Sequence, residues 1–404
     1  MADQTFITKL SLRNYKSIRS CAVPLGPLSF LVGPNGSGKS NFLDSLRFVA
    51  NSLRSSVEQA LRERGGINEV RRRSGGHPTH FSIRLDFHLP DRSHGHYAFR
   101  IGSMPQSGFE VQDEECVVNG HAGDPLSRAE FSVRSGRVEK MTGTIKPPAS
   151  RDRLFLVTAA GLPEFRPVFD NLSHMGFYNL NPEAMRDLQP PDAGELLERD
   201  GRNIASVVGR LARIDVPRKE RIEEYLAKVV PGVRGVDHKI LGPKETLEFR
   251  QEVAGSKDPW RFVAANMSDG TVRALGILAA LFQTGDGSAV PLVGIEEPEV
   301  ALHPGAAGVL LEGLIEASTR TQVVVTSHSP DLLDDARIKE GAILAVGAEG
   351  GMTVIGQPDE AGRKVLLENL YTAGELLRLN QLTPDRPKAA ETAKQMELFE
   401  LGGD

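Results

Sequence analysis

The stretch LVGPNGSGKSNF, residues 31 to 42, decides how the rest of the sequence is interpreted. Before it, the apolar run LSFLV at residues 28 to 32 predicts a buried strand. After Lys39, apolar residues recur at helical spacing and predict a helix. Between the two, Gly33 to Ser40 fit the pattern G-x-x-x-x-G-K-S, which is meaningful when a strand precedes it and a helix follows. A glycine turn that precedes Lys-Ser by chance is the alternative, and this flanking order argues against it.

The residue types in this loop suit a nucleoside triphosphate and its metal ion. Glycines let backbone N–H groups and the positive end of the following helix face the phosphate oxygens. Lys39 supplies a cation for the β- and γ-phosphates, and the Ser40 hydroxyl is a ligand for Mg²⁺. The predicted nucleotide-binding residues are Gly33, Pro34, Asn35, Gly36, Ser37, Gly38, Lys39, Ser40 and Asn41.

Two later apolar stretches end in polar residues that suit hydrolysis. LVGIEEPE runs into Glu296 and Glu297, and VVVTSHSPD places His328 at the end of another buried strand. Because ligands bind at the carboxyl ends of parallel strands, we expect these side chains beside the glycine loop. Glu296 is predicted to bind Mg²⁺, Glu297 to activate the attacking water, and His328 to contact the γ-phosphate or that water. Carboxylates of a surface turn and a structural histidine are the alternatives.

Residues 268 to 283 predict a helix that begins with a polar cap. Ser268 occupies the N-cap position, Asp269 follows it, and apolar residues line one face of the segment.

The order of the motifs GPNGSGKS, NMSDGTVRAL, GIEEPEVALHP and VTSHSP resembles the ABC-type ATPase heads of the RecF/SMC and OLD (overcoming lysogenization defect) class of predicted ATPases. The resemblance covers nearly the whole chain. It implies that Ser268, Asp269 and Gly270 form a signature loop that contacts the γ-phosphate bound by a second subunit. The residues it places in the D-loop, at the subunit interface, are Glu299, Leu302 and His303. His328 matches the switch histidine.

The sequence departs from the family pattern at three points. Glu296 stands where the metal-side carboxylate is usually Asp, and the signature has SDG in place of SGG. The Q-loop glutamine has no recognisable context, because Gln106, Gln112 and Gln189 lie outside any matching motif.

The fold class expected from this resemblance is α/β. It is a P-loop NTPase with an ABC-ATPase head: a RecA-like core, an antiparallel β subdomain and a helical signature lobe. The ATPase domain is predicted over residues 1–381, with a β-rich insertion at 79–160. A mainly helical lobe at 161–283 ends in the signature helix, and the Walker B and switch strands follow at 284–356. Residues 382–404 are rich in charge and proline, which predicts a flexible tail.

Composition limits the class of protein. Of the 404 residues, 40% are hydrophobic and 25% charged, which is typical of a globular chain. No apolar run approaches the ~20 residues that a membrane span needs, so we expect a cytoplasmic protein without membrane insertion. Two cysteines exclude a disulfide framework. Because the net charge is −5, contact with nucleic acid requires a local basic surface, for which the arginines between residues 62 and 73 are one candidate. A solvated charged loop is the alternative.

The sequence argues against two related protein classes, against a GTPase and against a zinc site. OLD nucleases continue into a Toprim domain with a D-x-D pair, but this chain has no D-x-D and only 76 residues after His328. Residues 41–267 lack the heptads that SMC coiled coils need. No N-K-x-D motif supports a GTPase. A cluster of four histidines has no accompanying cysteine and is not expected to hold zinc: His77, His80, His94 and His96.

The resemblance implies ATP binding and hydrolysis coupled to dimerisation. Two ATP molecules, each with Mg²⁺, are expected between the glycine loop of one subunit and the signature loop of the other, so that ATP closes a homodimer. We expect a regulator of DNA repair or phage defence, acting on nucleic acid or through a separately encoded nuclease partner. The nucleotide-binding subunit of a transporter is one alternative. A binding switch that uses ATP as a clamp with little turnover is another.

Overall fold

A computed structural model gives the fold of the protein. It describes residues 5–73, 78–120, 128–285 and 288–401. The chain divides into two compact units. The first comprises Met1–Met175, Ile338–Tyr371 and Leu376–Asp404. The second comprises Gly176–Arg337 and Thr372–Glu375. Helix α13 (Ala373–Arg378) contains the last boundary between them.

The first unit is built on a seven-stranded sheet in the order β2-β1-β4-β5-β6-β7-β8, with every neighbouring pair antiparallel. Its strands are β1 (Ile7–Tyr15), β2 (Ile18–Pro24), β4 (His80–His88), β5 (His94–Ser103), β6 (Phe109–Asn119), β7 (Arg128–Arg134) and β8 (Arg137–Met141). The alternating segments after residue 79 therefore do form antiparallel strands. They continue the sheet that β1 begins, because β4 pairs directly with β1.

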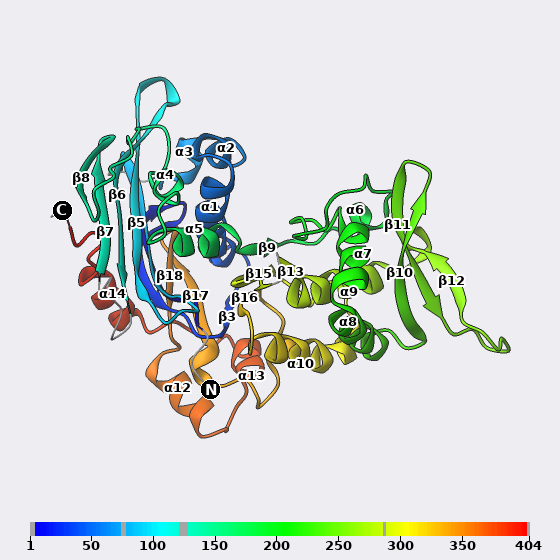
Figure 1. Ribbon diagram of the computed structural model, residues 1–404. Helices are drawn as coiled ribbons and strands as arrows, with labels where there is room; N and C mark the ends of the chain where they lie inside the picture. Colours follow the sequence, from blue (N-terminus) through cyan, green and yellow to red (C-terminus); the bar gives the residue numbers. More distant parts are fainter. Residues whose placement is uncertain (1–4, 74–77, 121–127, 286–287, 402–404) are drawn as a thin grey trace. The chain divides into compact units, whose positions relative to one another are not determined.

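Helix α1 (Lys39–Arg54) packs against this sheet, as the apolar spacing after the glycine loop predicts. The ring of Phe48 on α1 lies 5.4 Å from that of Phe81 and 6.3 Å from that of Tyr15, centroid to centroid. Four shorter helices belong to the same unit, and several of them lie on the same side of the sheet as α1 (Figure 1). They are α2 (Val57–Arg62), α3 (Ile67–Val70), α4 (Leu156–Ala159) and α5 (Arg166–Ser173).

A second group of strands in the first unit joins distant parts of the chain. Strand β3 (Leu28–Val32), which leads into the glycine loop, pairs in parallel with β17 (Ile343–Glu349). Strand β17 forms an antiparallel hairpin with β18 (Met352–Gly356), and β18 contacts β2. Helix α12 (Glu360–Leu367) follows the hairpin.

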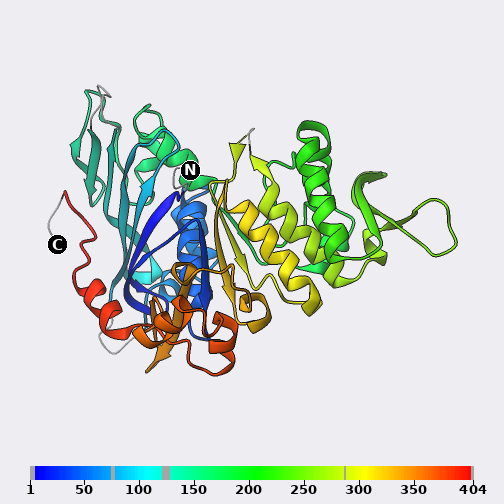
Figure 2. The ribbon, with the colours of Figure 1, turned by 90° about the horizontal axis from the view of Figure 1, so that it is seen from below.

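The second unit contains the two buried strands that the sequence predicts. Strand β15 (Leu292–Glu296) pairs in parallel with β16 (Gln322–Ser327) on one side and with β9 (Gly176–Tyr178) on the other. The helices of this unit are α6 (Pro182–Arg186), α7 (Ile204–Ile214), α8 (Val216–Val229), α9 (Asp269–Phe282), α10 (Ala307–Ala317) and α11 (Pro330–Leu333). Helices α8, α9 and α10 lie side by side (Figures 1 and 2). A short hairpin is formed by β13 (Thr284–Gly285) and β14 (Ser288–Ala289).

The lobe between residues 161 and 283 contains a sheet that the sequence analysis missed. Strands β10 (Val233–Leu241), β11 (Lys244–Gln251) and β12 (Trp260–Val263) form an antiparallel sheet. Helices α7 and α8 contact β10, and the loop after β11 projects away from them (Figure 2). The turn signal Gly242-Pro243 marks this hairpin, because Gly242 has a φ of 61°.

The C-terminal segment also differs from the flexible tail predicted for it. Helix α14 (Arg386–Lys394) contacts β2 and β18, and Met396 and Leu398 are buried with Ala22. The carboxylate of Glu115 accepts hydrogen bonds from two backbone N–H groups near the end of the described chain, at 2.7 and 3.0 Å. Charge and proline content predicted mobility, but the few apolar residues of the segment find a place on the sheet.

No helix within the described residues combines the length and the apolar composition that crossing a bilayer requires.

A buried ion cluster ties α1 to the segments around it. The Asp44 carboxylate lies 2.6 Å from Lys16 Nζ, 2.6 Å from Arg47 Nη2 and 2.9 Å from Arg64 Nη2. It also accepts a hydrogen bond from the Tyr15 hydroxyl at 2.9 Å. Burial alone raises the pKa of the Asp44 carboxyl, but the cations, Arg64 and Arg47 foremost, outweigh it and hold that pKa well below its usual range.

We predict that Asp44→Asn lowers the free energy of unfolding at pH 7 by about 3 kcal/mol, since it removes the carboxylate that pairs with the buried Arg64 guanidinium. A carboxyl with a depressed pKa stabilises the fold above its unfolded pKa of about 4 and loses this effect as the pH falls toward the folded pKa. The difference in the free energy of unfolding between wild type and variant should therefore become smaller below about pH 4. Urea unfolding at a series of pH values measures it. Asp152→Asn, which removes an exposed pair with Arg153, is the control and should have a much smaller effect.

Candidate nucleotide and hydrolysis sites

The glycine-rich loop joins β3 to α1 in the first unit, and its backbone conformation requires glycine at two points. Gly36 has a φ of 75° and Gly38 a φ of 105°, in the left-handed region that other residues rarely adopt. Gly38 is the N-cap of α1, and no side chain caps the helix there. The predicted order of strand, loop and helix is confirmed.

Gly33 and Gly38 also lie too close to the β17–β18 hairpin to carry side chains. A β-carbon at Gly33 would lie 2.0 Å from the carbonyl oxygen of Val346. A β-carbon at Gly38 would lie 2.0 Å from Oγ1 of Thr353. Any substitution at either glycine must therefore displace the loop or the hairpin.

The loop backbone curls around the amino group of Lys39. This side chain is buried, and its Nζ donates hydrogen bonds to the carbonyl oxygens of Gly33 at 2.7 Å and Pro34 at 3.0 Å. Pro34, Asn35, Gly36 and Ser40 are exposed. The loop thus presents a cation within a turn whose outer residues are open to solvent.

A chain of hydrogen bonds holds the loop to the hairpin. The Thr353 hydroxyl donates to the carbonyl oxygen of Ser37 at 2.8 Å and lies 2.7 Å from the hydroxyl of Ser17. Asn41 Nδ2 donates to the same Ser17 hydroxyl at 2.7 Å. The sequence analysis did not identify Ser17 or Thr353, because neither lies in a local motif.

The loop fits a phosphate group by its own chemistry. The Ser37 hydroxyl is buried and has no hydrogen-bond partner within the described chain. Leaving such a group unpaired costs about 1–3 kcal/mol, which an acceptor oxygen of a ligand would offset. The Lys39 cation and the uncapped start of the 16-residue helix α1 add positive potential at the same place.

In the second unit, β15 ends at the first of the two predicted carboxylates. Glu296 Oε1 accepts a hydrogen bond from Arg199 Nη2 at 3.0 Å. Arg199 was not predicted to take part, and no sequence signal links it to Glu296. The pairing orients the Glu296 carboxylate and offsets its charge.

Glu297 adopts an uncommon backbone conformation, with a φ of 46°. Its N–H donates to the carbonyl oxygen of Thr326 on β16 at 2.9 Å. Its side chain is partly exposed, and Oε1 lies 3.2 Å from Nδ1 of His328, within ion-pair distance but not aligned for a hydrogen bond. The structure therefore brings together the carboxylate predicted to activate water and the predicted switch histidine.

The segment after Glu297 is anchored to the end of β16. The Glu299 carboxylate accepts hydrogen bonds from the Ser327 hydroxyl at 2.7 Å and from the His328 N–H at 3.3 Å. Leu302 is partly exposed, and His303 is exposed and accepts a hydrogen bond from the N–H of Gly305 at 3.0 Å.

Helix α9 begins as predicted, and its first residues contact the same segment. The Ser268 hydroxyl caps the helix by accepting a hydrogen bond from the Thr271 N–H at 3.3 Å. Asp269 pairs with Arg186 of α6 at 2.7 Å. A β-carbon at Gly270 would lie 2.6 Å from the carbonyl oxygen of Ala301. The backbone of the signature loop is therefore in contact with the backbone of the segment that follows Glu297.

Of the three glutamines considered for the Q-loop, Gln189 has a structural role. Its amide donates to the Met185 carbonyl at 3.0 Å and accepts from the Ala205 N–H at 2.9 Å, in a buried position.

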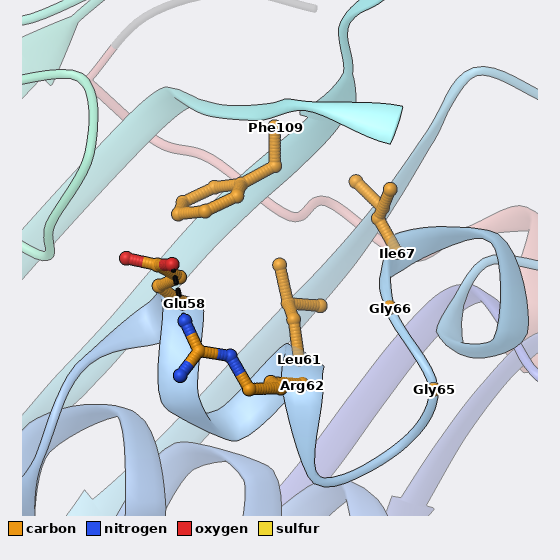
Figure 3. Close-up of a pocket in the computed structure, with 7 residues that line it drawn as sticks. All are labelled: Glu58, Leu61, Arg62, Gly65, Gly66, Ile67 and Phe109. Atoms are coloured by element: carbon orange, nitrogen blue, oxygen red, sulfur yellow. Dashed lines mark hydrogen bonds and ion pairs between the residues drawn. The ribbon is translucent and has the colours of Figure 1, made fainter. Parts of the chain in front are cut away.

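The arginine-rich segment at residues 62–73 is largely paired within the first unit. Arg62 contacts Glu58, Arg64 contacts Asp44, and Arg73 contacts Glu69. A cavity of about 380 Å³ opens beside the first of these pairs, with Phe109 facing α2 across it (Figure 3). Its lining residues are Glu58, Leu61, Arg62, Gly65, Gly66, Ile67 and Phe109. None of them belongs to the glycine loop.

The histidine cluster is only partly described, because His77 lies outside the described residues. His96 is bonded to Glu115, with Nε2 2.8 Å from the carboxylate. Among the residues with assigned positions, no group of three His, Cys, Asp or Glu side chains is arranged to hold a metal ion.

Two family models match the chain. The model described as "AAA ATPase domain" matches residues 6–117, which include the glycine loop. The model described as "AAA domain, putative AbiEii toxin, Type IV TA system" matches residues 160–334, which include the signature loop, both glutamates and His328.

Relatives of two kinds share sequence with the chain. The OLD nuclease of Thermus scotoductus is 23% identical over 359 residues, which cover 82% of this chain and 61% of that protein. Structural maintenance of chromosomes protein 1 of Schizosaccharomyces pombe is 25% identical over 159 residues, covering 37% of this chain and 13% of that protein. The chain therefore spans about three fifths of the nuclease and a small part of the chromosome protein.

Solved SMC heads share the fold. The SMC head bound to the C-winged helix domain of ScpA has a TM-score of 0.55 and 15% identity, covering 87% of this chain and 96% of that one. The Pyrococcus furiosus SMC head with an extended coiled coil also has a TM-score of 0.55, with 12% identity over 90% of this chain and 99% of that one. The predicted P-loop α/β head is thus confirmed. These matches and the motifs support an OLD/RecF/SMC-like class of ATPase for this chain.

Proposed function

We propose that this protein binds ATP with Mg²⁺, hydrolyses it, and uses the cycle to close and reopen a homodimer. The observation that carries the proposal is the glycine loop. There the Lys39 cation and the uncapped start of α1 occur together with a buried Ser37 hydroxyl that has no hydrogen-bond partner in the described part of the chain. These are the groups that bind phosphate oxygens. Lys39 would exchange its carbonyl partners for the β- and γ-phosphates.

Two oxygen donors suit the metal ion. The Ser40 hydroxyl is exposed at the first turn of α1, and Glu296 ends β15. Bound Mg²⁺ would neutralise charge on the phosphate oxygens during transfer. Arg199 holds the Glu296 carboxylate in one orientation, which compensates for the longer side chain at a position where this class usually has Asp.

Glu297 is the proposed general base. It would accept a proton as the water oxygen attacks the γ-phosphorus and the bond to the leaving ADP breaks, so that ADP and phosphate are the products. Its partly exposed carboxylate lies next to His328, whose imidazole would hold the γ-phosphate or the water. The two side chains are therefore assigned to one catalytic group.

The signature loop is proposed to serve a nucleotide bound by the other subunit. Ser268 and Asp269 are exposed at the start of the 14-residue helix α9, where backbone N–H groups and the helix dipole favour an anion. Charge developing on the γ-phosphate would thus be stabilised from both subunits.

The biological role that we propose is regulation of DNA repair or phage defence, with nucleic acid or a separately encoded nuclease as partner. Support comes from the similarity to a protein named OLD nuclease over 359 residues. Within residues 62–73, the ion pairs of Arg62, Arg64 and Arg73 reduce the support for this segment as the nucleic-acid contact.

We predict that Lys39→Ala weakens ATP binding by about 10-fold or more, because a charge-assisted contact to the phosphates is lost. Titration with a fluorescent ATP analogue measures the affinity. Lys388→Ala, on the exposed helix α14, is the control and should leave it unchanged. If Lys39→Ala binds ATP as the wild type does, the glycine loop is not the nucleotide site.

We predict different effects for the adjacent glutamates. Glu297→Gln should keep ATP binding but lower kcat about 100-fold or more, because the amide cannot accept the proton from water. Glu296→Gln should instead raise the Mg²⁺ concentration that half-maximal activity requires. Phosphate release at varied Mg²⁺ concentrations measures both effects, with the exposed Glu58→Gln as control. A Glu297→Gln variant that turns over at the native rate would refute the assignment.

Complementation tests the composite site. We predict that Lys39→Ala and Ser268→Arg chains are each inactive but regain activity when mixed, because one site then pairs an intact glycine loop with an intact signature loop. Position 268 is preferable to 270, where any side chain meets the Ala301 carbonyl and would distort the unit itself. Ser268→Asn, which retains a capping side chain, is the matched control. Light scattering verifies that mixed dimers form with ATP. Mixed dimers without recovered activity would exclude shared sites.

A further inference from the structure

Arg273 is a buried arginine within an otherwise apolar helix. It lies on α9, five residues after Ser268, and is only 7% exposed. Its neighbours along the helix are almost all apolar and buried. Burial of an arginine is costly unless its donors are paired, so a residue of this kind in a packed helix calls for a specific explanation.

The guanidinium donates to backbone carbonyls that lie just after β9 and at the end of β15. Nη1 donates to the carbonyl oxygen of Leu180 at 2.7 Å. Nη2 donates to the carbonyl oxygen of Glu297 at 3.0 Å and makes a longer contact of 3.5 Å to the carbonyl oxygen of Glu296. Nε has no partner within the described chain. Among the described residues no carboxylate forms an ion pair with Arg273, so its charge acts on the peptide groups of the two glutamates.

These contacts complete a clamp on the Glu297 backbone. The Glu297 N–H is held by Thr326 on β16, and its carbonyl oxygen is held by Arg273 on α9. The φ of 46° between them is a conformation that a glutamate rarely adopts without such restraint. Because this backbone sets where the side chain starts, the clamp fixes the direction of the carboxylate toward His328.

The same helix carries the signature residues at its start. Gly270 abuts the carbonyl of Ala301, whose own φ is 66°, in the turn that follows Glu297. A displacement of α9 therefore reaches Glu297 by two routes, through Arg273 and through this backbone contact.

We propose that Arg273 is a positioning residue that couples the signature loop to Glu297. The water-activating carboxylate is then aligned only when α9 keeps its contacts with the carbonyl oxygens of Glu297 and Ala301. The inference rests on the proposed function, because it assigns a use to the signature loop and to Glu297. Arg273 itself touches neither nucleotide nor water in this role.

The test compares Arg273→Met, Arg273→Lys and wild type. Arg273→Met should bind ATP and dimerise with it as the wild type does, while kcat falls by about 10- to 100-fold with an unchanged KM. Arg273→Lys, which can reach one of the carbonyls, should recover part of kcat. A kcat equal to that of the wild type, or a joint loss of dimer and turnover that lysine does not relieve, would overturn the inference.

Hydrogen exchange on the same proteins tests this inference separately from the proposed function. It also shows whether Arg273→Met loosens this turn alone or destabilises the whole fold. Amides of residues 297–302 should exchange faster in Arg273→Met, while those of the seven-stranded sheet remain unchanged. If the wild type neither hydrolyses ATP nor dimerises with it, the proposed function fails, yet selective loosening of this turn still supports the clamp. If exchange at residues 297–302 does not differ, Arg273 does not position Glu297.

Discussion

The first unit depends on the close approach of two glycines to a hairpin that lies more than 300 residues later in the chain. Because Gly33 and Gly38 carry no side chains, the loop backbone can lie against Val346 and Thr353. That contact places the Ser37 carbonyl within reach of the Thr353 hydroxyl, while the buried Ser37 hydroxyl has no hydrogen-bond partner among the residues that the structure describes. The phosphate binding that we propose for the loop therefore depends on tight packing as much as on its own residues, since a looser loop would expose these groups to water.

In the second unit, the corresponding constraint is a strained turn. Glu297 and Ala301 both have positive φ, a conformation that costs about 1–3 kcal/mol for each such residue and persists where the surroundings enforce it. Here the restraint comes from Thr326, Arg273 and the Glu299 carboxylate, which bind the turn to the neighbouring strand and helix. A turn held in this way has few alternative conformations, which suits a carboxylate that must face one reacting atom. It also makes the turn sensitive to any shift of α9.

Several arginines of this protein form ion pairs with carboxylates close to them in the fold. Three of the arginines that suggest a basic surface in the sequence pair with carboxylates nearby: Arg62 with Glu58, Arg64 with Asp44 and Arg73 with Glu69. Arg199 pairs with Glu296 in the same manner. These pairs orient side chains around α1 and at the end of β15, whereas Arg71 donates to the Asn68 side chain and to the Pro78 carbonyl oxygen. A run of arginines therefore predicts a binding surface poorly until their partners are known.

The sequence by itself determined the order of strand, glycine loop and helix, the cap at Ser268 and the strands that lead to Glu296 and His328, because each depends on residues adjacent or at regular spacing. The class of ATPase followed from the resemblance of the ordered motifs to a known family. An arginine inside the apolar segment DGTVRALGILAALF was a signal available for Arg273, although its partners were not. Only the tertiary structure decided those partners, the Thr353 contact to the loop, the Arg199 pair and the docking of the C-terminal segment. These interactions join residues between 23 and 316 positions apart. The free energy of such contacts depends on burial and packing, which the local sequence pattern does not encode.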